Sequence, residues 1–331
     1  MVESVNLAPL PWQRAQWARL HDARRQGRLA HAVLLQGAPG LGVDQFAHRF
    51  AQSLLCETPR ADHAACGACP ACRQFALRIS ADFRALAVLQ DKTQITVDQV
   101  RELIEFLGLT RGRASVKVAV IDPAEAMNVN ACNSLLKTLE EPAGSAVLIL
   151  VANNLGRLPA TIRSRCQLIK FPQPDTAEAH AWLVQHGVES PELALRLAHG
   201  APCLALEQNQ AAAREAFREA FEATFDALKH RPALGEFAKR ATPIGLPRLL
   251  QLQMSLLRDL LRCHAGLPAA SFENSVVFDD MRRLSRTLDY RTLSRAYDRC
   301  AAMLGMLNHP LSPELSRDRI LIDWIGLAPH R

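Results

Sequence analysis

Five short apolar runs, separated by stretches with helical patterning, occupy the first half of this 331-residue chain. They cover His31–Gln36, Phe83–Leu89, Val116–Ile121, Ala146–Ala152 and Cys166–Phe171. Several are apolar at nearly every position, which is typical of parallel strands whose two faces are both covered by helices. Strands that alternate with helices form the pattern of an α/β fold. The first half of the chain therefore predicts a parallel sheet between helices.

No strand pattern follows the last of these runs. Residues 173–208 show only short amphipathic helices, and helical patterning continues from 209 to 331. Between 249 and 261, leucines form two adjacent stripes on one helix. We interpret these stripes as core packing, with an oligomerisation surface as the alternative. The predicted domains are an α/β module at 1–172, a small helical domain at 173–208 and an all-α domain at 209–331.

Composition excludes some classes of protein. Hydrophobic residues make up 49% and charged residues 22% of the chain, which argues against global disorder. No apolar run approaches the roughly 18 residues that a membrane span needs. The first residues lack a basic segment followed by an apolar one, so we expect no secretory signal and a cytoplasmic location. A net charge of +6 permits contact with nucleic acid without showing it.

A glycine-rich loop follows the first predicted strand directly, where a phosphate-binding loop belongs. Its glycines are Gly37, Gly40 and Gly42, and the first and last have the spacing of the complete motif. That motif continues with Lys and then with Ser or Thr, but Val43 and Asp44 stand here. Valine places no cation on phosphate, and aspartate brings a negative charge where a hydroxyl should hold Mg²⁺.

The third predicted strand ends in an acid, which is the form of a Walker B segment. The acid is Asp122, and the next residue is Pro123. Nucleotide-hydrolysing enzymes of this kind usually carry a second acid there, and proline cannot activate water. Three positions of one scaffold therefore lack their chemical groups, which indicates a nucleotide site that has lost its function. We do not expect ATP to bind tightly.

Four of the nine cysteines fall within a short segment, at Cys56, Cys66, Cys69 and Cys72. A compact loop can wrap four thiolates around a tetrahedral Zn²⁺, and a complete thiolate shell makes such a site structural. An iron–sulfur cluster and a redox disulfide are the alternatives. We interpret His63, inside this loop, as a solvated residue. Arg163 and Arg165, just before the last predicted strand, carry little meaning by composition.

Several strings together resemble the clamp-loader branch of the AAA+ ATPases. They are Leu135-Leu-Lys-Thr-Leu-Glu-Glu-Pro142, Ser164-Arg165-Cys166, the degenerate loop, Asp122-Pro-Ala-Glu-Ala-Met-Asn128 and the four-cysteine insertion at 56–72. The resemblance covers essentially the whole chain. It implies a RecA-like AAA+ module, a small helical lid and a helical collar that packs subunits into a ring.

The resemblance also implies a role and partners. The implied role is a non-hydrolysing stator subunit that helps to open a sliding clamp and load it on primed DNA during replication. The implied partners are the gamma and tau ATPase subunits and a delta subunit, within the DNA polymerase holoenzyme. Arg165 would reach a neighbour's ATP site as an arginine finger, and the alternative is a structural ion pair inside its own domain. ATP-binding relatives carry a sensor arginine near residues 200–204; none stands there, and Arg196 lies one turn earlier.

Two other functions stay open at this point. One is a catalytically active AAA+ ATPase of DNA metabolism, which would need Lys and Ser or Thr directly after Gly42. The other is a zinc-dependent nucleic-acid-binding protein. Arg111, Arg113 and Lys117 form a short basic stretch for it, but no aromatic residues interleave them for stacking on bases.

Overall fold

The computed structural model describes residues 7–90, 92–110, 112, 114–142, 144–209, 211–268, 271–274, 277–306 and 313–328. The chain divides into two compact units, Met1–Ala205 and Leu206–Arg331. The predicted lid, residues 173–208, lies in the first unit as far as Ala205, and the division into three domains stays a prediction. Among the described residues, no helix is long and apolar enough to cross a membrane.

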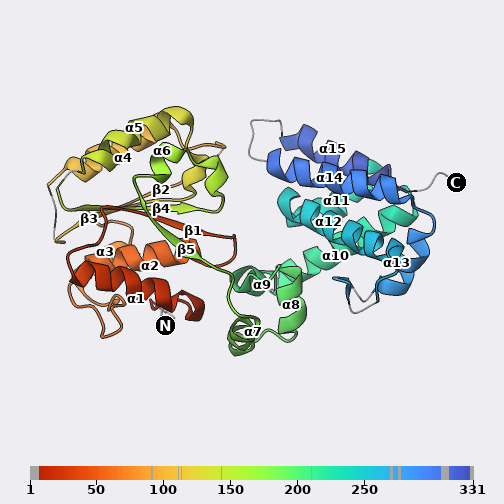
Figure 1. Ribbon diagram of the computed structural model, residues 1–331, viewed down its shortest axis with the longest axis horizontal. Coiled ribbons are helices and arrows are strands. Elements are labelled where there is room, and N and C mark those ends of the chain that lie inside the picture. Colours follow the sequence, from red (N-terminus) through yellow and green to blue (C-terminus); the bar gives the residue numbers. More distant parts are fainter. Residues whose placement is uncertain are drawn as a thin grey trace. The chain divides into compact units, whose positions relative to one another are not determined.

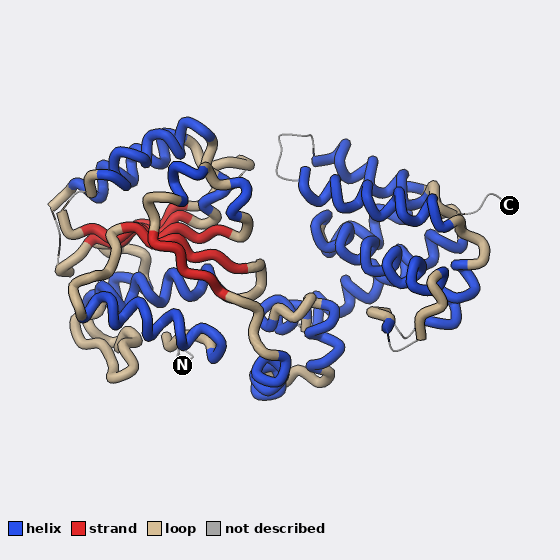
Figure 2. The backbone as a smooth tube through the Cα atoms, viewed as in Figure 1, coloured by secondary structure: helices blue, strands red, loops and turns tan. Residues whose placement is uncertain are grey.

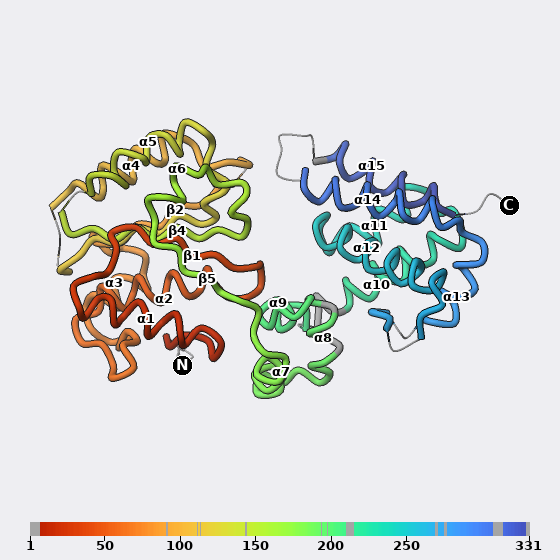
Figure 3. The backbone as a smooth tube through the Cα atoms, viewed as in Figure 1, coloured from red at the N-terminus to blue at the C-terminus, as the bar shows by residue number. Residues whose placement is uncertain are grey.

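The first unit is built on a sheet of five strands among the described residues, in the order β2-β3-β4-β1-β5. The strands are β1 (Ala32–Gly37), β2 (Phe83–Leu86), β3 (Lys117–Ile121), β4 (Ala146–Ala152) and β5 (Gln167–Phe171). Every pairing is parallel, and β1 lies between β4 and β5 although they follow much later in the chain (Figure 3). The predicted parallel sheet is confirmed.

Helices cover both faces of this sheet (Figure 1), and the strands form the middle layer (Figure 2). The helices of the first unit are α1 (Arg14–Arg25), α2 (Val43–Leu55), α3 (Pro70–Ala76), α4 (Val97–Gly108), α5 (Val129–Glu140), α6 (Ala160–Arg163), α7 (Thr176–Gln185), α8 (Pro191–Leu197) and α9 (Pro202–Gln208). Short 3₁₀ turns are η1 (Pro11–Gln13), η2 (Ala124–Ala126) and η3 (Leu155–Arg157).

The alternation of side chains along β1 explains why its sequence is apolar throughout. Val33 and Leu35 pack into the core on the side of α1 and α2, whereas Ala32 and Leu34 pack into the core on the side of α4 and α5. Successive residues of a strand point to opposite faces, so a strand covered on both sides must be apolar at every position.

One predicted strand is longer than the observed one. The apolar run Phe83–Leu89 forms a strand only as far as Leu86. The reason is the neighbour: β2 pairs with β3, whose last residue, Ile121, lies opposite Leu86. Beyond that point β2 has no strand to pair with, because Pro123 and η2 turn the chain away. An apolar run predicts a strand, but its partner decides where the strand ends.

The described part of the second unit is helical. Its elements are α10 (Ala211–Lys229), α11 (Leu234–Ala241), η4 (Thr242–Ile244), α12 (Leu246–His264), α13 (Phe278–Ser285), α14 (Tyr290–Met306) and α15 (Pro313–Ile325). The leucine stripes of α12 are largely buried and lie in one apolar core with residues of α10, α14 and α15. Trp324 of α15 is buried in that core and donates its indole N–H to the Thr224 carbonyl of α10 (2.8 Å).

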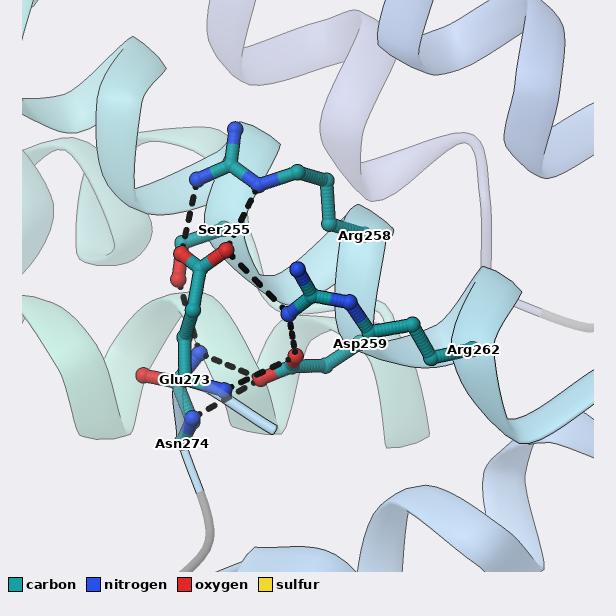
Figure 4. A network of polar contacts seen from close by, with 6 residues as sticks. All are labelled: Ser255, Arg258, Asp259, Arg262, Glu273 and Asn274. Atoms are coloured by element: carbon teal, nitrogen blue, oxygen red, sulfur yellow. Dashed lines mark hydrogen bonds and ion pairs between the residues drawn. The ribbon is translucent and has the colours of Figure 1, made fainter. Parts of the chain in front are cut away.

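A buried polar network fastens the segment after α12 to that helix (Figure 4). Asp259 is fully buried and accepts hydrogen bonds from the amides of Glu273 and Asn274 and from the side chain of Arg262. Arg258 donates two hydrogen bonds to the Glu273 carboxylate, at 2.8 and 2.7 Å. Burial raises the pKa of Glu273, but the bonds from Arg258 outweigh it and leave that pKa below its ordinary value.

We expect the substitution Asp259→Ala to lower the free energy of unfolding of the helical unit by about 3 kcal/mol, because it leaves the amides of Glu273 and Asn274 without their acceptor and removes one of the two carboxylates that Arg262 contacts. Hydrogen exchange of the α12 amides in the full chain measures this loss. Asp298 of α14 is exposed, so Asp298→Ala should change the same free energy by no more than about 0.5 kcal/mol. Equal losses in the two variants would contradict the assignment.

Candidate functional site

The glycine loop lies between the end of β1 and the start of α2, as the sequence predicts. Gly42 is the N-cap of α2, and Val43 is the first residue of that helix. The Val43 side chain is 4% exposed and belongs to the core between the sheet and α2. Asp44 is exposed on the first turn. The residue that replaces the phosphate-binding lysine is therefore part of the hydrophobic core.

Side chains from the start of the chain bind the carbonyl groups of this loop. The Trp12 indole N–H donates to the Leu41 carbonyl (3.0 Å). The Gln13 amide, which is fully buried, donates to the carbonyls of both Leu41 and Gly42 at 2.9 Å. Protein groups thus hold the second half of the loop, and their hydrogen bonds order it without a ligand.

The start of α9 packs directly against the same loop. The amide of Cys203 donates to the Gly40 carbonyl (3.0 Å). A Cβ atom on Gly40 would lie 2.5 Å from the Leu204 Cβ, so only glycine allows this approach. Trp12 also meets Trp182 of α7 edge to face, with ring centroids 5.2 Å apart. Helices α7 and α9 of the predicted lid are therefore fastened to the sheet module by protein contacts.

The acid at the end of β3 lies where the sequence predicts, and the Asp122–Pro123 peptide is cis. Burial, together with the nearby carboxylates of Asp44 and Glu125, raises the pKa of Asp122 to about 6. Burial is the largest of these causes, and the nearby His48 acts in the opposite direction.

The four predicted cysteines converge. Their sulfur atoms all lie within 4.8 Å of one another. The Sγ atoms of Cys56 and Cys69 are 4.0 Å apart, and those of Cys66 and Cys72 are 3.9 Å apart. A tetrahedron of sulfurs about 2.3 Å from a central ion has edges of about 3.8 Å. The cluster therefore has the dimensions of a site that could hold one tetrahedral metal ion.

Hydrogen-bond donors surround these sulfurs. The amides of Ala68 and Cys69 both donate to the Cys66 Sγ, at 3.4 and 3.3 Å. The Thr58 hydroxyl donates to the same sulfur, and mainly this bond lowers the pKa of Cys66 to about 6. Burial raises the pKa of Cys56 and Cys72 and so disfavours their thiolates. A bound cation would balance that charge and make the thiolates stable.

The interpretation of His63 as a solvated residue is wrong. Its ring stacks on the ring of His21 at 5.0 Å, with the planes 15° apart. His21 is buried beside Trp17 of α1, and burial lowers the pKa of His21 to about 4. The cysteine loop is therefore packed against α1 through His63, although His63 belongs to no metal-ligand group.

Arg165 lies between α6 and β5, with its side chain 35% exposed. Its Nε and Nη2 atoms both contact the Glu140 Oε1, at 2.8 and 2.5 Å, and its Nη1 donates to the Thr161 carbonyl (3.1 Å). Glu140 is the last residue of α5. An ion pair of Arg165 within its own domain is the alternative that the sequence leaves open, and its partner Glu140 belongs to the Leu135–Pro142 string.

The sheet separates Arg165 from the glycine loop of its own chain. The registers pair Val33 with Gln167 and Gly37 with Phe171, so Arg165 lies beyond the amino end of β1. His31, at that same end, contacts the Leu139 carbonyl next to Glu140. Six residues of strand span about 20 Å. Arg165 therefore cannot act on its own loop.

The one residue of the predicted basic stretch that the structure describes, Lys117, does not face solvent. Lys117 is buried, donates to the Ala81 carbonyl (3.1 Å) and lies 4.2 Å from the centre of the Phe106 ring. Arg111 and Arg113 lie outside the described residues. Arg196 is exposed on α8 and does not stand at the start of α9, where Pro202 begins the helix. The start of α9 therefore lacks the arginine that ATP-binding relatives carry there.

Sequence analysis misses most of the residues that close the loop. Trp12, Gln13 and Trp182 carry no motif, because each acts through a contact with a distant segment. Thr58 is missed for the same reason. The one available signal is the loop itself, since a glycine motif without its lysine predicts that other groups hold it.

A parallel sheet with a phosphate-loop position after the interior strand β1, an acid after β3 and small helices after β5 defines a RecA-like module of the AAA+ class. The model of the family "DNA polymerase III, delta subunit" matches residues 12–175. DNA polymerase III subunit delta' of Pseudomonas aeruginosa is 37% identical over 72% of this chain and 73% of that protein. The corresponding Escherichia coli protein is 32% identical over 77% of both chains.

Subunit gamma of Buchnera aphidicola is 33% identical over 44% of this chain and 39% of that protein. The chain belongs to the family of DNA polymerase III delta-prime subunits.

We expect the purified chain to hold one metal ion, and the substitution Cys72→Ser to remove it, because three thiolates leave a tetrahedral site incomplete. Metal analysis of protein purified under reducing conditions measures the stoichiometry. Cys132 is as buried as Cys72 but lies outside the cluster, so Cys132→Ser should keep the metal content unchanged. Loss of metal in both variants, or a wild-type chain without metal, would contradict the assignment.

Proposed function

We propose that this protein is a non-hydrolysing stator subunit of a DNA polymerase III clamp loader. It assembles with gamma or tau ATPase subunits and a delta subunit, and helps to open the sliding clamp and load it on primed DNA during replication. Its closest support is membership of the delta-prime family, and the observation that carries the non-hydrolysing role is the closed loop. The chain would work with these partners in the cytoplasm.

The loop supports an enzymatically silent subunit in three ways. Val43 is buried in the core, so no cation reaches a phosphate from that position. Carbonyls of the loop already accept hydrogen bonds from Trp12 and Gln13, and α9 lies on Gly40. Pro123 replaces the carboxylate that would activate water. An active ATPase needs all three positions, so the alternative of a catalytic AAA+ enzyme has no support.

The same contacts support a rigid part. Trp182 and Cys203 join the lid segment to the module through protein atoms. Opening such a joint would break a hydrogen bond and buried apolar contacts. Without a bound nucleotide, no new contacts would offset the free energy that this costs. We propose that residues 1–172, 173–208 and 209–331 act as module, lid and collar, and that the collar packs against neighbouring subunits.

We assign the metal as structural Zn²⁺ at Cys56, Cys66, Cys69 and Cys72. Four thiolates around one ion fill every position of the tetrahedron, so the ion would stabilise the loop at 56–72 and catalyse nothing. Sulfur atoms about 4 Å apart suit one mononuclear centre. Zinc gives no visible absorbance, whereas an iron–sulfur cluster is coloured, and this difference separates the two assignments in the purified protein.

We assign Arg165 as an arginine finger that acts on a neighbour's ATP. Charge develops on the γ-phosphate oxygens during transfer, and a guanidinium matches those oxygens through paired hydrogen bonds. Two observations support action on another subunit. Arg165 lies about 20 Å of strand away from the loop of its own chain, and that loop has lost its phosphate-binding lysine.

The isolated chain should bind Mg-ATP too weakly to detect by calorimetry at micromolar protein concentrations, because the loop offers no cation and is already closed. The double substitution Val43→Lys with Asp44→Thr should not restore turnover, because Pro123 still lacks a carboxylate and position 43 faces the core. Circular dichroism checks that this variant is folded. A micromolar dissociation constant for the wild-type chain would contradict the proposal.

In a reconstituted complex, Arg165→Ala should lower clamp- and DNA-stimulated ATPase activity. Arginine fingers contribute about 10³-fold or more at one site, and other ATP sites in the complex would dilute the loss in the total rate. Arg163 lies two residues earlier and is exposed on α6, so Arg163→Ala is the matched control and should leave the rate unchanged. Equal ATPase rates for the two variants would reject the finger, and an Arg165→Ala variant that does not fold or enter the complex would favour a structural ion pair instead.

A further inference from the structure

The Arg165 guanidinium is fully engaged with its own domain. Nε and Nη2 contact the Glu140 carboxylate, while Nη1 donates to the Thr161 carbonyl and contacts the Ser164 hydroxyl. All three nitrogens of the side chain thus have a partner. A guanidinium that binds phosphate presents the paired N–H groups of its fork to the oxygens. The observed contacts use groups on both branches of that fork.

The position of Glu140 is unfavourable without Arg165. Glu140 ends α5, and a helix C-terminus carries a partial negative charge from its unpaired carbonyl groups. A carboxylate there is repelled, and a cation beside it removes that repulsion. Glu141 follows directly and is exposed, so it repeats the charge without the contact. Of these two acids, Glu140 is therefore the one that forms an ion pair with Arg165.

We propose that Glu140 holds Arg165 in a retracted position and that this ion pair must open before Arg165 reaches a neighbour's ATP. This inference rests on the proposed role of Arg165 as a finger. The pair is half-exposed, with Glu140 52% and Arg165 35% accessible, so it is weak enough to open. Glu140 is thus a positioning residue that sets how much of the subunit is ready to act, and it touches no reacting atom.

The fraction of ready subunits enters the apparent affinity directly. When only part of a protein is in its binding-competent state, the apparent dissociation constant rises by the inverse of that fraction. Glu140→Gln removes the charge and keeps the shape of the side chain. It should therefore raise the ready fraction by about two- to fivefold, the factor that a half-exposed ion pair contributes.

The first measurement uses the full chain by itself. Proton exchange of the Arg165 Nε–H with water, followed by ¹⁵N NMR, should be about two- to fivefold faster in Glu140→Gln. Glu141→Gln is the matched control, since it removes the same charge one residue away, and it should exchange like the wild type. No acceleration in Glu140→Gln would overturn the proposal whatever the complex does.

The second measurement uses the reconstituted complex with clamp and primed DNA. In Glu140→Gln, the ATP concentration that gives half of the stimulated rate should fall by up to about two- to fivefold, while the maximal rate stays the same. When Arg165 is replaced by Ala, the further change Glu140→Gln should have no effect. A shift that persists in that background would overturn the proposal, because Glu140 would then act on something else.

The remaining outcomes separate the two levels of the argument. If Arg165→Ala and Arg163→Ala give equal rates, the finger itself fails and the holding role fails with it. If Arg165→Ala lowers the rate but Glu140→Gln changes neither exchange nor half-saturation, only the holding role fails. A rate in Glu140→Gln as low as in Arg165→Ala would also overturn the proposal, because Glu140 would then help the finger instead of restraining it.

Discussion

The direction of the five strands in one parallel sheet decides where everything else in the first unit lies. Because β1 pairs with β4 on one side and with β5 on the other, and all strands run the same way, the glycine loop and Asp122 both lie at the carboxyl ends of the strands. Arg165 lies at the opposite end of the sheet, where the strands begin, next to the start of β1. One sheet thus places the glycine loop and Arg165 the length of a strand apart, about 20 Å.

The two ends of the sheet differ in how firmly their groups are held. At the carboxyl ends of the strands, Trp12 and Gln13 bind the carbonyls of the loop, α9 covers Gly40 and Val43 lies in the core. A loop held in this way is ordered without a phosphate. At the amino ends of the strands, Arg165 and Glu140 are half-exposed, and an ion pair in contact with water contributes little to stability. Protein contacts therefore hold the loop end of the sheet firmly, whereas the contact of Arg165 with Glu140 is weak.

The accuracy of sequence prediction follows the distance over which each feature is built. The four-cysteine cluster is predicted completely, because its ligands lie in one short segment and spacing alone constrains them to one loop. The sheet is predicted as well, since burial on both faces leaves a continuous apolar signal. Lys117 and His63 are misjudged, because each was assigned by its charge or polarity while its surroundings, Phe106 and His21, come from other segments. The predicted end of β2 at Leu89 is wrong for a similar reason, because its partner β3 ends at Ile121, opposite Leu86.

By itself, the sequence determined which chemical groups this chain has and which it lacks: four thiols in one loop, glycines without their lysine, an acid followed by proline, and an arginine before the last strand. Only the tertiary structure decided what those groups meet. Trp12 and Trp182, or Arg165 and Glu140, are joined by packing and by weak contacts that leave no periodicity or spacing in the chain. Composition and order are properties of the polymer, whereas a contact between distant residues exists only after the sheet and its helices have assembled.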